Sequence, residues 1–386
     1  MNYCKGNDGR NGDTLMIIGL GEIGGKALEI LARRPCISRI VAANRNIEYG
    51  KQKVNNAVFG ASLEGYYPNI VYTPIDLNNI EETAETIAKY NPTVIFNITT
   101  LQSYWMVELL PKEIHKKIQE ISYGMWIPMH LTLCYKLMLA IEKSGINTMV
   151  VNGAYPDAVN PAISKVCQFP ISGIGNGELV IPQIKKVVSE KLNVPMRSVS
   201  CLLVQHHYTE YWIVREGHEG GGRSYLKILV DGNDVTNEFD RENLWKDVIR
   251  LAKRPGRPDG HYIVASSAIQ KMLAIYHDTN ELSSCIAGPA GLLGGYPGRL
   301  GRKGFTMVLP DGISFEDAKK INEESSALEG IEKITEDGTI IFTEKNSSLM
   351  KQLIGYNCKS MKIQESEDWA NELGKLYKEF SSKIIR

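Results

Sequence analysis

Short apolar runs and amphipathic segments alternate through the first 155 residues of the chain. The apolar runs predict strands over residues 15–18, 38–43, 69–73, 93–98 and 147–151. The segments between them predict helices over residues 27–34, 78–88 and 127–144. Pro128 opens the last of these helices and Gly145 closes it, in keeping with the residues preferred at helix ends. Strands that alternate with helices at this spacing predict an α/β fold with a doubly wound parallel sheet.

The pattern changes near Tyr155. Pro156, Pro161 and Pro170 interrupt it, so we predict a boundary between a first domain, residues 1–155, and a second domain, residues 156–386. Apolar or alternating runs in the second domain predict antiparallel strands over residues 199–204, 211–215 and 225–230. Helices are predicted over residues 182–191, 241–253, 261–277 and 367–381. We therefore expect an α+β second domain that contains antiparallel strands.

A glycine-rich turn follows the first predicted strand. The sequence Gly19-Leu20-Gly21-Glu22-Ile23-Gly24 joins this strand to a helix. Gly19 suits a tight turn, Gly21 lets the backbone approach a phosphate, and Gly24 lets the helix lie close to the strand. The first N–H groups of the helix then face the anion. We predict a Rossmann dinucleotide-binding unit whose turn contacts the cofactor through Gly19, Gly21, Glu22, Ile23 and Gly24.

The residues after the second predicted strand bear on the choice of cofactor. NAD-binding units place an Asp or Glu there to hold the ribose 2′-hydroxyl, whereas this chain has Asn44 and Arg45. Because a guanidinium can pair with a 2′-phosphate and no carboxylate repels it, the sequence favours NADP over NAD. The alternative is that Arg45 is a solvated turn residue and that the carboxylate lies elsewhere. At the ends of the next two strands, we also expect cofactor contacts from Asp76, Asn97 and Thr99.

Two segments beyond residue 150 carry candidate catalytic residues. His206 and His207 follow a predicted strand, where adjacent side chains point to opposite faces, so one of them can line a cleft. Histidine suits the general acid–base step of a hydride transfer. Asn152 and Asp157 follow the strand 147–151, at the end where ligands bind in open α/β sheets. The alternatives are hydrogen-bonded histidines at a strand end, and turn or cap residues.

Histidines and glutamates gather in the same region, but their spacing is not that of a metal site. The group consists of His206, His207, Glu210, Glu216, His218 and Glu219. No His-x-x-x-His pattern occurs among them, so we predict no metal site.

Charge and composition limit the classes of partner. The 44 Lys and Arg residues balance 44 Asp and Glu residues, and no long basic run points to nucleic acid or to an anionic membrane. Residues 1–8 lack the apolar core of a signal peptide, and no uninterrupted apolar stretch is long enough to span a membrane. Seven cysteines without a Cys-x-x-Cys pair indicate reduced thiols. We expect a cytoplasmic protein whose partner is a small-molecule substrate.

Four motifs in the second half occur in the order known from one enzyme superfamily. Residues 152–157 resemble the Asn-Pro turn that follows a strand in that superfamily, and residues 173–176 resemble its glycine segment. Residues 295–305 resemble its late strand with the pattern Pro-x-x-Leu-Gly-x-x-Gly. Residues 204–209, Val-Gln-His-His-Tyr-Thr, resemble Gly-Glu-His-Gly-Asp-Thr. The chain thus resembles the lactate/malate dehydrogenase superfamily, which includes the NAD-dependent family 4 glycosidases. The resemblance places His206 on the catalytic histidine.

Departures from these motifs indicate a divergent member. In the dehydrogenases, Leu-Asp-x-x-Arg supplies an Asp that orients the histidine and an Arg that binds the substrate carboxylate, but residues 177–183 contain neither. Gly175 stands where the family 4 glycosidases have a metal-ligating Cys. The N-terminal half, with Asn44-Arg45 and the run 94–97, resembles the cofactor domain of saccharopine dehydrogenase-like proteins.

These features lead to one main hypothesis and two alternatives. The main hypothesis is an NAD(P)-dependent oxidoreductase that transfers a hydride between nicotinamide and a small polar substrate, such as a hydroxy acid, an amino or imino acid, or a sugar. His206 or His207 would be its acid and base. One alternative is a glycosidase-like enzyme that uses the cofactor transiently, and the other is a non-catalytic NADP-binding sensor. We also expect a homo-oligomer, either a dimer or a tetramer.

Overall fold

A six-stranded parallel sheet forms the centre of the protein. The computed structural model describes residues 12–168 and 170–384, so residues 1–8, which bear on the signal-peptide prediction, lie outside the described part. The strand order is β3-β2-β1-β4-β5-β6. The strands are β1 (Leu15–Ile18), β2 (Ile40–Asn44), β3 (Ile70–Pro74), β4 (Val94–Asn97), β5 (Met149–Asn152) and β6 (Ile171–Gly173). The predicted doubly wound parallel sheet is confirmed, with a sixth strand from beyond residue 155.

The register of the sheet brings the carboxyl ends of its central strands to one edge. Ile18 at the end of β1 pairs with Ala43 of β2 and with Asn97 of β4, and Asn97 pairs with Asn152 of β5. Ligands of open parallel sheets bind outside this edge. The turns that follow β1, β2, β4 and β5 therefore converge where a ligand crevice is expected.

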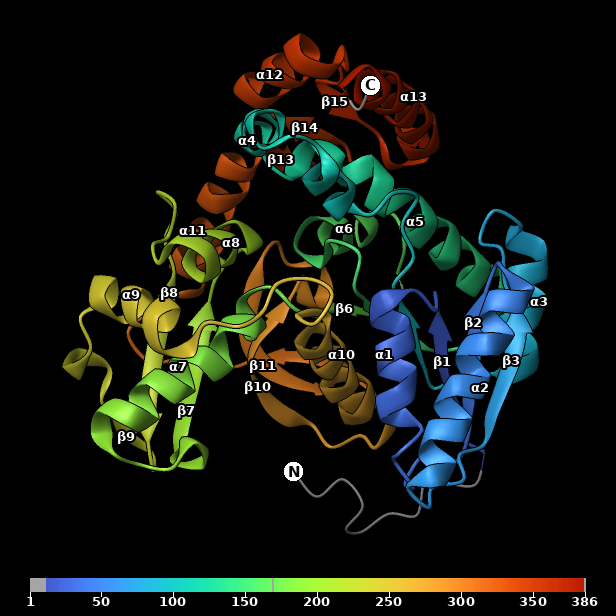
Figure 1. The fold of residues 1–386 in the computed structure, drawn as a ribbon, viewed down its shortest axis with the longest axis horizontal. Coiled ribbons are helices and arrows are strands. Elements are labelled where there is room, and N and C mark those ends of the chain that lie inside the picture. Colours follow the sequence, from blue (N-terminus) through green and yellow to red (C-terminus); the bar gives the residue numbers. More distant parts are fainter. Residues whose placement is uncertain (1–11, 169, 385–386) are drawn as a thin grey trace.

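Helices cover both faces of the sheet (Figure 1). Ile17 and Phe96 point to the face covered by α1, α2 and α10. Ile18 and Ile95 point to the opposite face, covered by α3 and α5. Because these strands are buried on both faces, their sequences are continuously apolar. The helices of the two layers are α1 (Glu22–Leu31), α2 (Ile47–Leu63), α3 (Ile80–Tyr90), α5 (Ile127–Ser144) and α10 (His261–Tyr276).

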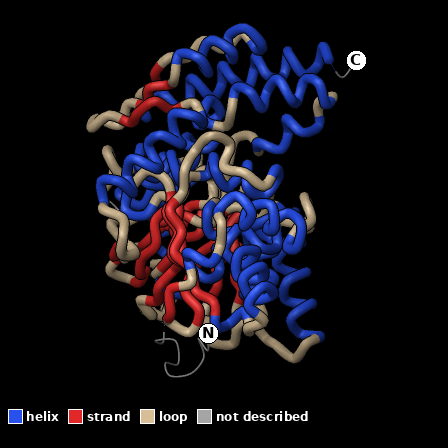
Figure 2. Tube along the Cα trace, turned by 90° about the vertical axis from the view of Figure 1, so that its left-hand side faces the viewer, coloured by secondary structure: helices blue, strands red, loops and turns tan. Residues whose placement is uncertain are grey.

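The second half adds three small antiparallel sheets and further helices (Figure 2), as expected for an α+β part of the chain. The sheets consist of β7 (Val199–Val204), β8 (Tyr225–Val230) and β9 (Asn233–Asp234); β10 (Glu281–Ala287), β11 (Gly295–Gly301) and β12 (Gly304–Met307); and β13 (Ile331–Ile334), β14 (Ile340–Phe342) and β15 (Ser360–Met361). The remaining helices are α4 (Lys112–Ile121), α6 (Pro156–Ile163), α7 (Gly177–Leu192), α8 (His207–Glu216), α9 (Arg241–Ala252), α11 (Phe315–Glu329), α12 (Glu344–Ile354) and α13 (Ser366–Ile384).

Two hydrophobic cores contain residues from both sides of the predicted boundary at Tyr155. In one core, α10 packs with α1 and α2. In the other, the C-terminal elements β13–β15, α12 and α13 pack with α5, beside which Figure 1 places them. The segment Gly124–Ser144, which includes α5, is the one stretch of the described chain long and apolar enough to cross a membrane, and it is mostly buried here. The boundary thus falls within shared cores rather than between separate ones.

The segment 211–215 is helical, so the predicted strand there is wrong. It belongs to α8, whose buried residues Thr209, Glu210 and Ile213 lie on one helical face. Gly217 ends the helix with a φ of 72°, in the left-handed region that favours glycine. The aromatic and β-branched residues of this segment favour a strand, but burial at helical spacing and the glycine cap decide the helix.

The helix α2 is absent from the sequence-based prediction because its buried face is unusually small. Gly50, Val54, Ala57 and Ala61 are its buried residues, and they produce only a weak apolar period. Asn46 caps the helix by accepting a hydrogen bond from the Tyr49 N–H at 3.0 Å. This cap also fixes the turn that carries Arg45.

A buried ion pair joins α7 to α10. The ammonium of Lys271, which is fully buried, pairs with Glu178 in the first turn of α7. The Ser267 hydroxyl donates to the same carboxylate at 2.5 Å and accepts from the Gly175 N–H at 2.9 Å. The pair therefore holds the start of α7, and the glycine segment before it, against α10.

We expect Lys271→Met to lower the free energy of unfolding by about 3 kcal/mol, because it leaves the Glu178 carboxylate, which is only 13% exposed, without its cation. Equilibrium urea unfolding followed by circular dichroism measures this loss. The double variant Glu178→Leu/Lys271→Met removes both charges and should recover part of it. A double variant no more stable than the single one would contradict an electrostatic origin.

Candidate active site

The glycine turn has the geometry that an anion-binding turn requires. Gly19 has a φ of 101°, and a Cβ added there would lie 3.0 Å from the Thr99 side chain. A Cβ on Gly24 would overlap the Gly19 carbonyl oxygen at 1.9 Å, so only glycine allows α1 to lie this close to β1. A Cβ on Gly21 would meet no atom within 4 Å, and no side chain caps α1. The turn therefore leaves space and free N–H groups for a dinucleotide pyrophosphate.

Glu22 and Ile23, the next two residues, connect this turn to the second half of the chain. One Glu22 oxygen lies 3.2 Å from a terminal nitrogen of Arg257, and the other lies 2.7 Å from the His261 Nδ1 atom. Partial burial raises the pKa of the Glu22 carboxyl, but Arg257 and His261 outweigh it and hold this pKa below its usual value. Ile23 lines a cavity that extends into the second half.

The turn after β2 presents an exposed arginine. Arg45 has no ion-pair partner among the described residues, and the side chain of Asn44 donates to the Asn46 carbonyl at 3.2 Å. The Tyr72 hydroxyl supports the turn by donating to the Asn44 carbonyl at 2.9 Å. Asp76 lies one strand further out and accepts from the Asn78 N–H at 3.0 Å. Among the described side chains, Arg45 is thus available to an anion at the end of β2.

Three buried asparagine side chains join β4, β5 and α6. The Asn97 amide donates to the Asn152 Oδ1 atom at 3.3 Å, and the Asn152 amide donates to Asn160 at 2.9 Å. The Asn97 Oδ1 atom accepts from the Thr99 hydroxyl at 2.7 Å. Asn152 is fully buried and does not line the cavity. These amides hold the loops at the sheet edge in place, including the loop that carries Thr99.

The two adjacent histidines have different surroundings. His206 caps α8: its Nδ1 atom accepts from the Tyr208 N–H at 3.2 Å, and its ring is fully buried. Burial lowers the pKa of His206 to about 4, so this imidazole is neutral at pH 7. His207, the first residue of α8, lines the cavity. His207, rather than the histidine aligned by the dehydrogenase motif, therefore reaches the space where a substrate can bind.

Glu329, which sequence reasoning missed, is the partner of His207. Its Oε1 atom lies 2.5 Å from the His207 Nδ1 atom, and its Oε2 atom accepts from the Tyr155 hydroxyl at 2.6 Å. Burial lowers the pKa of His207, but the charge of Glu329 outweighs burial and raises this pKa to about 9. Burial raises the pKa of Glu329, yet His207 holds it below its usual value. At neutral pH the pair is imidazolium and carboxylate.

Asp157 supports His207 from the side away from the cavity. Its Oδ1 atom accepts from the His207 backbone N–H at 3.1 Å, whereas its Oδ2 atom has no hydrogen-bond partner among the described residues. Burial raises the pKa of Asp157 to about 7, although His207 opposes this shift. Asp157 does not line the cavity. The structure therefore brings Asp157 to the backbone of the cavity histidine and not to a substrate position.

A cavity of about 670 Å³ extends from Ile23, in the first turn of α1, to His207. Its walls combine aromatic rings with charged groups. The lining residues include Ile23, Tyr104, Tyr123, His207, Tyr208, Glu210, Tyr211, Trp212, Arg215, Arg254, Arg257 and Glu329. Ligand cavities of this size bind small molecules and cofactors. We take this cavity as the candidate active site.

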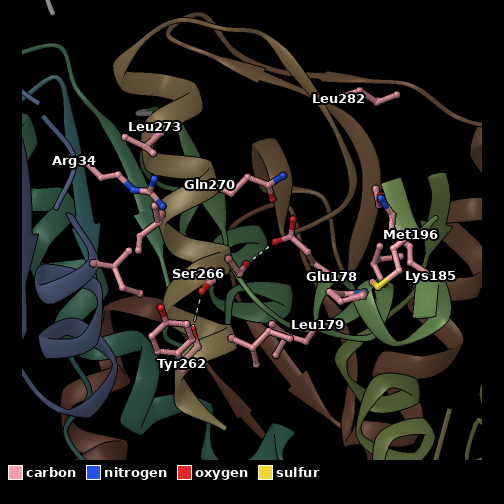
Figure 3. Close-up of a pocket in the computed structure, with 17 residues that line it drawn as sticks. Arg34, Glu178, Leu179, Lys185, Met196, Tyr262, Ser266, Gln270, Leu273 and Leu282 are labelled. Carbon is pink, nitrogen blue, oxygen red and sulfur yellow. Dashed lines mark hydrogen bonds between the residues drawn. The ribbon is translucent and has the colours of Figure 1, made fainter. Parts of the chain in front are cut away.

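A second cavity, of about 550 Å³, lies between α1, α7 and α10 (Figure 3). Arg34, Tyr262, Gln270 and Glu178 are among the residues that line it, and Glu178 accepts a hydrogen bond from the Ser267 hydroxyl. None of the predicted cofactor-binding or catalytic residues lines this cavity. Two of its lining residues, Glu178 and Ser267, belong to the contact between α7 and α10 described above.

Comparison with solved structures defines the fold. Malate dehydrogenase from Picrophilus torridus is 15% identical, with a TM-score of 0.57 over 82% of this chain and 96% of that chain. Malate dehydrogenase from Plasmodium falciparum is 14% identical, with a TM-score of 0.53 over 94% and 99%. Lactate dehydrogenase from Eimeria maxima, solved with NADH and oxamate, is 15% identical, with a TM-score of 0.56 over 82% and 93%. The chain has the fold of lactate and malate dehydrogenases.

Other comparisons find no relative. No known protein-family profile matches the chain, and no curated protein matches it. The resemblance to lactate and malate dehydrogenases is thus confirmed for the fold. The resemblances to family 4 glycosidases and to saccharopine dehydrogenase-like proteins stay predictions.

The charge of Glu329 sets the protonation of His207, so we expect Glu329→Gln to lower the pKa of His207 from about 9 to below about 6.5. Burial then acts on the imidazole without a compensating anion. A histidine NMR titration measures the shift, with His207→Asn identifying the resonance. Glu324→Gln, an exposed change on the same helix, should leave the pKa unchanged. Equal pKa values in the protein and in Glu329→Gln would contradict this electrostatic coupling.

Proposed function

We propose that the protein is an NAD(P)-dependent dehydrogenase that acts on a carbinol or carbonyl carbon of a small polar substrate. The observation that carries this proposal is the cavity that extends from Ile23, in the first turn of the helix that follows the glycine turn, to His207 and its buried partner Glu329. The shared fold supports it, since the fold neighbours are lactate and malate dehydrogenases. Gly19, Gly21 and Gly24 would hold the pyrophosphate, and when bound, the nicotinamide would supply or accept the hydride.

His207 would be the acid and base of the reaction. As an imidazolium it donates a proton to the substrate carbonyl oxygen during reduction, and as a neutral imidazole it takes the hydroxyl proton during oxidation. Glu329 and Tyr155 hold the ring in place through the 2.5 Å and 2.6 Å contacts at the two Glu329 oxygens. Asp157, Asn152 and His206 would be positioning residues, because they are buried behind the cavity wall.

The pKa of His207 gives the direction of the pH dependence. With a pKa of about 9, His207 is protonated at neutral pH, so kcat/KM for reduction should be constant below pH 9 and fall above it. For oxidation, kcat/KM should rise with pH up to about pH 9. His207→Asn should lower kcat by about 10²- to 10⁴-fold and leave nucleotide affinity unchanged.

Steady-state assays with NADP and NAD over hydroxy acids, amino acids and sugars provide the measurement. Exposed His218→Asn is the matched control and should retain activity. Net cofactor reduction is expected; product release without net reduction would favour the glycosidase-like alternative. Tight nucleotide binding without turnover of any substrate would favour the sensor. A His207→Asn variant with full activity would contradict the acid–base role.

Arg45 would select NADP through its 2′-phosphate. Its exposure at the end of β2, without a carboxylate partner among the described residues, supports this choice. We expect Arg45→Gln to raise the Kd for NADPH about tenfold and to change the Kd for NADH less than about twofold. Fluorescence titration measures both constants. Lys51→Gln, an exposed cation on α2, is the control. Equal losses for both nucleotides would contradict recognition of the 2′-phosphate.

A further inference from the structure

The segment between α9 and α10, residues 253–260, connects the cavity to the glycine turn. Two of its arginines line the cavity, and each pairs with a carboxylate on a different helix. Arg254 contacts Glu210 of α8 at 2.8 Å, and Arg257 contacts Glu22 of α1 at 3.2 Å. The segment therefore brings a cation of the second half to the first residue of α1.

Contacts from two elements of the first half hold the Arg257 guanidinium. Its Cζ atom lies 3.8 Å from the centre of the Trp105 ring, in the 3₁₀ helix η1 (Tyr104–Leu109) after β4, and its terminal nitrogen contacts Glu22. Glu22 directly follows Gly21, beside which there is open space. His261 contacts the second oxygen of the same carboxylate. The Arg257 guanidinium is thus held at Glu22, the residue that directly follows Gly21 and the open space beside it.

The carboxylate of Glu22 opposes an anion at this turn. It repels a phosphate at short range and also competes for Arg257. The Glu22 side chain is 44% exposed and that of Arg257 is 27% exposed, and ion pairs this open to water contribute little to stability. A pyrophosphate carries more charge and offers oxygens that suit the planar guanidinium, so it is the stronger partner.

We propose that Arg257 binds the pyrophosphate of the dinucleotide by exchanging the Glu22 carboxylate for phosphate oxygens. The inference rests on the proposed function and adds a cofactor-binding residue from the second half of the chain. Trp105 retains its stack on the guanidinium during the exchange, so the cation stays oriented toward the turn. Glu22 holds Arg257 beside the turn until the nucleotide binds, at the cost of weaker binding.

The exchange predicts that removing the charge of Arg257 and removing the charge of Glu22 change the nucleotide affinity in opposite directions. The probe is NADPH or NADH, whichever the unmodified protein binds more tightly, with Kd measured by fluorescence titration. Arg257→Gln is expected to raise Kd about tenfold, and Glu22→Gln to lower it about threefold. In the Glu22→Gln background, Arg257→Gln should cost more than in the unmodified protein, because the competing carboxylate is gone.

Lys246→Gln is the matched control, since it removes an exposed cation that also pairs with a glutamate, Glu242, but lies on α9 outside the cavity. It should change Kd less than about twofold, and circular dichroism checks that each variant is folded. The inference is overturned if Arg257→Gln binds as tightly as Lys246→Gln, or if Glu22→Gln weakens binding, while the unmodified protein still binds the nucleotide. If the unmodified protein binds neither nucleotide, the proposed function itself fails, and this inference fails with it.

Discussion

The candidate active site depends on the buried ion pair between His207 and Glu329. The Glu329 side chain is 3% exposed and that of His207 is 19% exposed, so either charge alone would be costly, and the imidazolium, the carboxylate and the Tyr155 hydroxyl satisfy one another. The two partners are 122 residues apart and belong to α8 and α11. The packing of these two helices against each other and the protonation of His207 therefore depend on the same interaction.

The parts of the site that the sequence predicts are those that short segments determine. Gly19, Gly21 and Gly24 are recognisable because one turn needs each of them for a different steric reason. Asn97 and Asn152 are predictable as neighbours because parallel strands align their carboxyl ends, and the structure pairs them in register. In both cases the relevant geometry is contained in one strand and its turn, or in the regular spacing of a sheet.

The parts that the sequence does not predict arise from packing between distant segments. Nothing near Glu329 distinguishes it from other glutamates at helix ends, because its partner lies on another helix. The choice between His206 and His207 depends on the start of α8, and a helix that begins one residue away would exchange their environments. Arg257 lies in a polar turn, and only the docking of α10 on α1 brings it to Glu22.

In the dehydrogenases, the carboxylate that orients the catalytic histidine belongs to the motif Leu-Asp-x-x-Arg. The corresponding residues of this chain, 177–183, contain no Asp. Glu329 supplies a carboxylate from α11 instead. A carboxylate within hydrogen-bond distance raises the pKa of a histidine, and any element that reaches the ring can provide one. Substrate recognition is a separate requirement: of the arginines that line the cavity, Arg254 and Arg257 each pair with a carboxylate, whereas Arg215 stacks on the Tyr211 ring. The carboxylate beside a histidine can therefore come from a different element of the same fold.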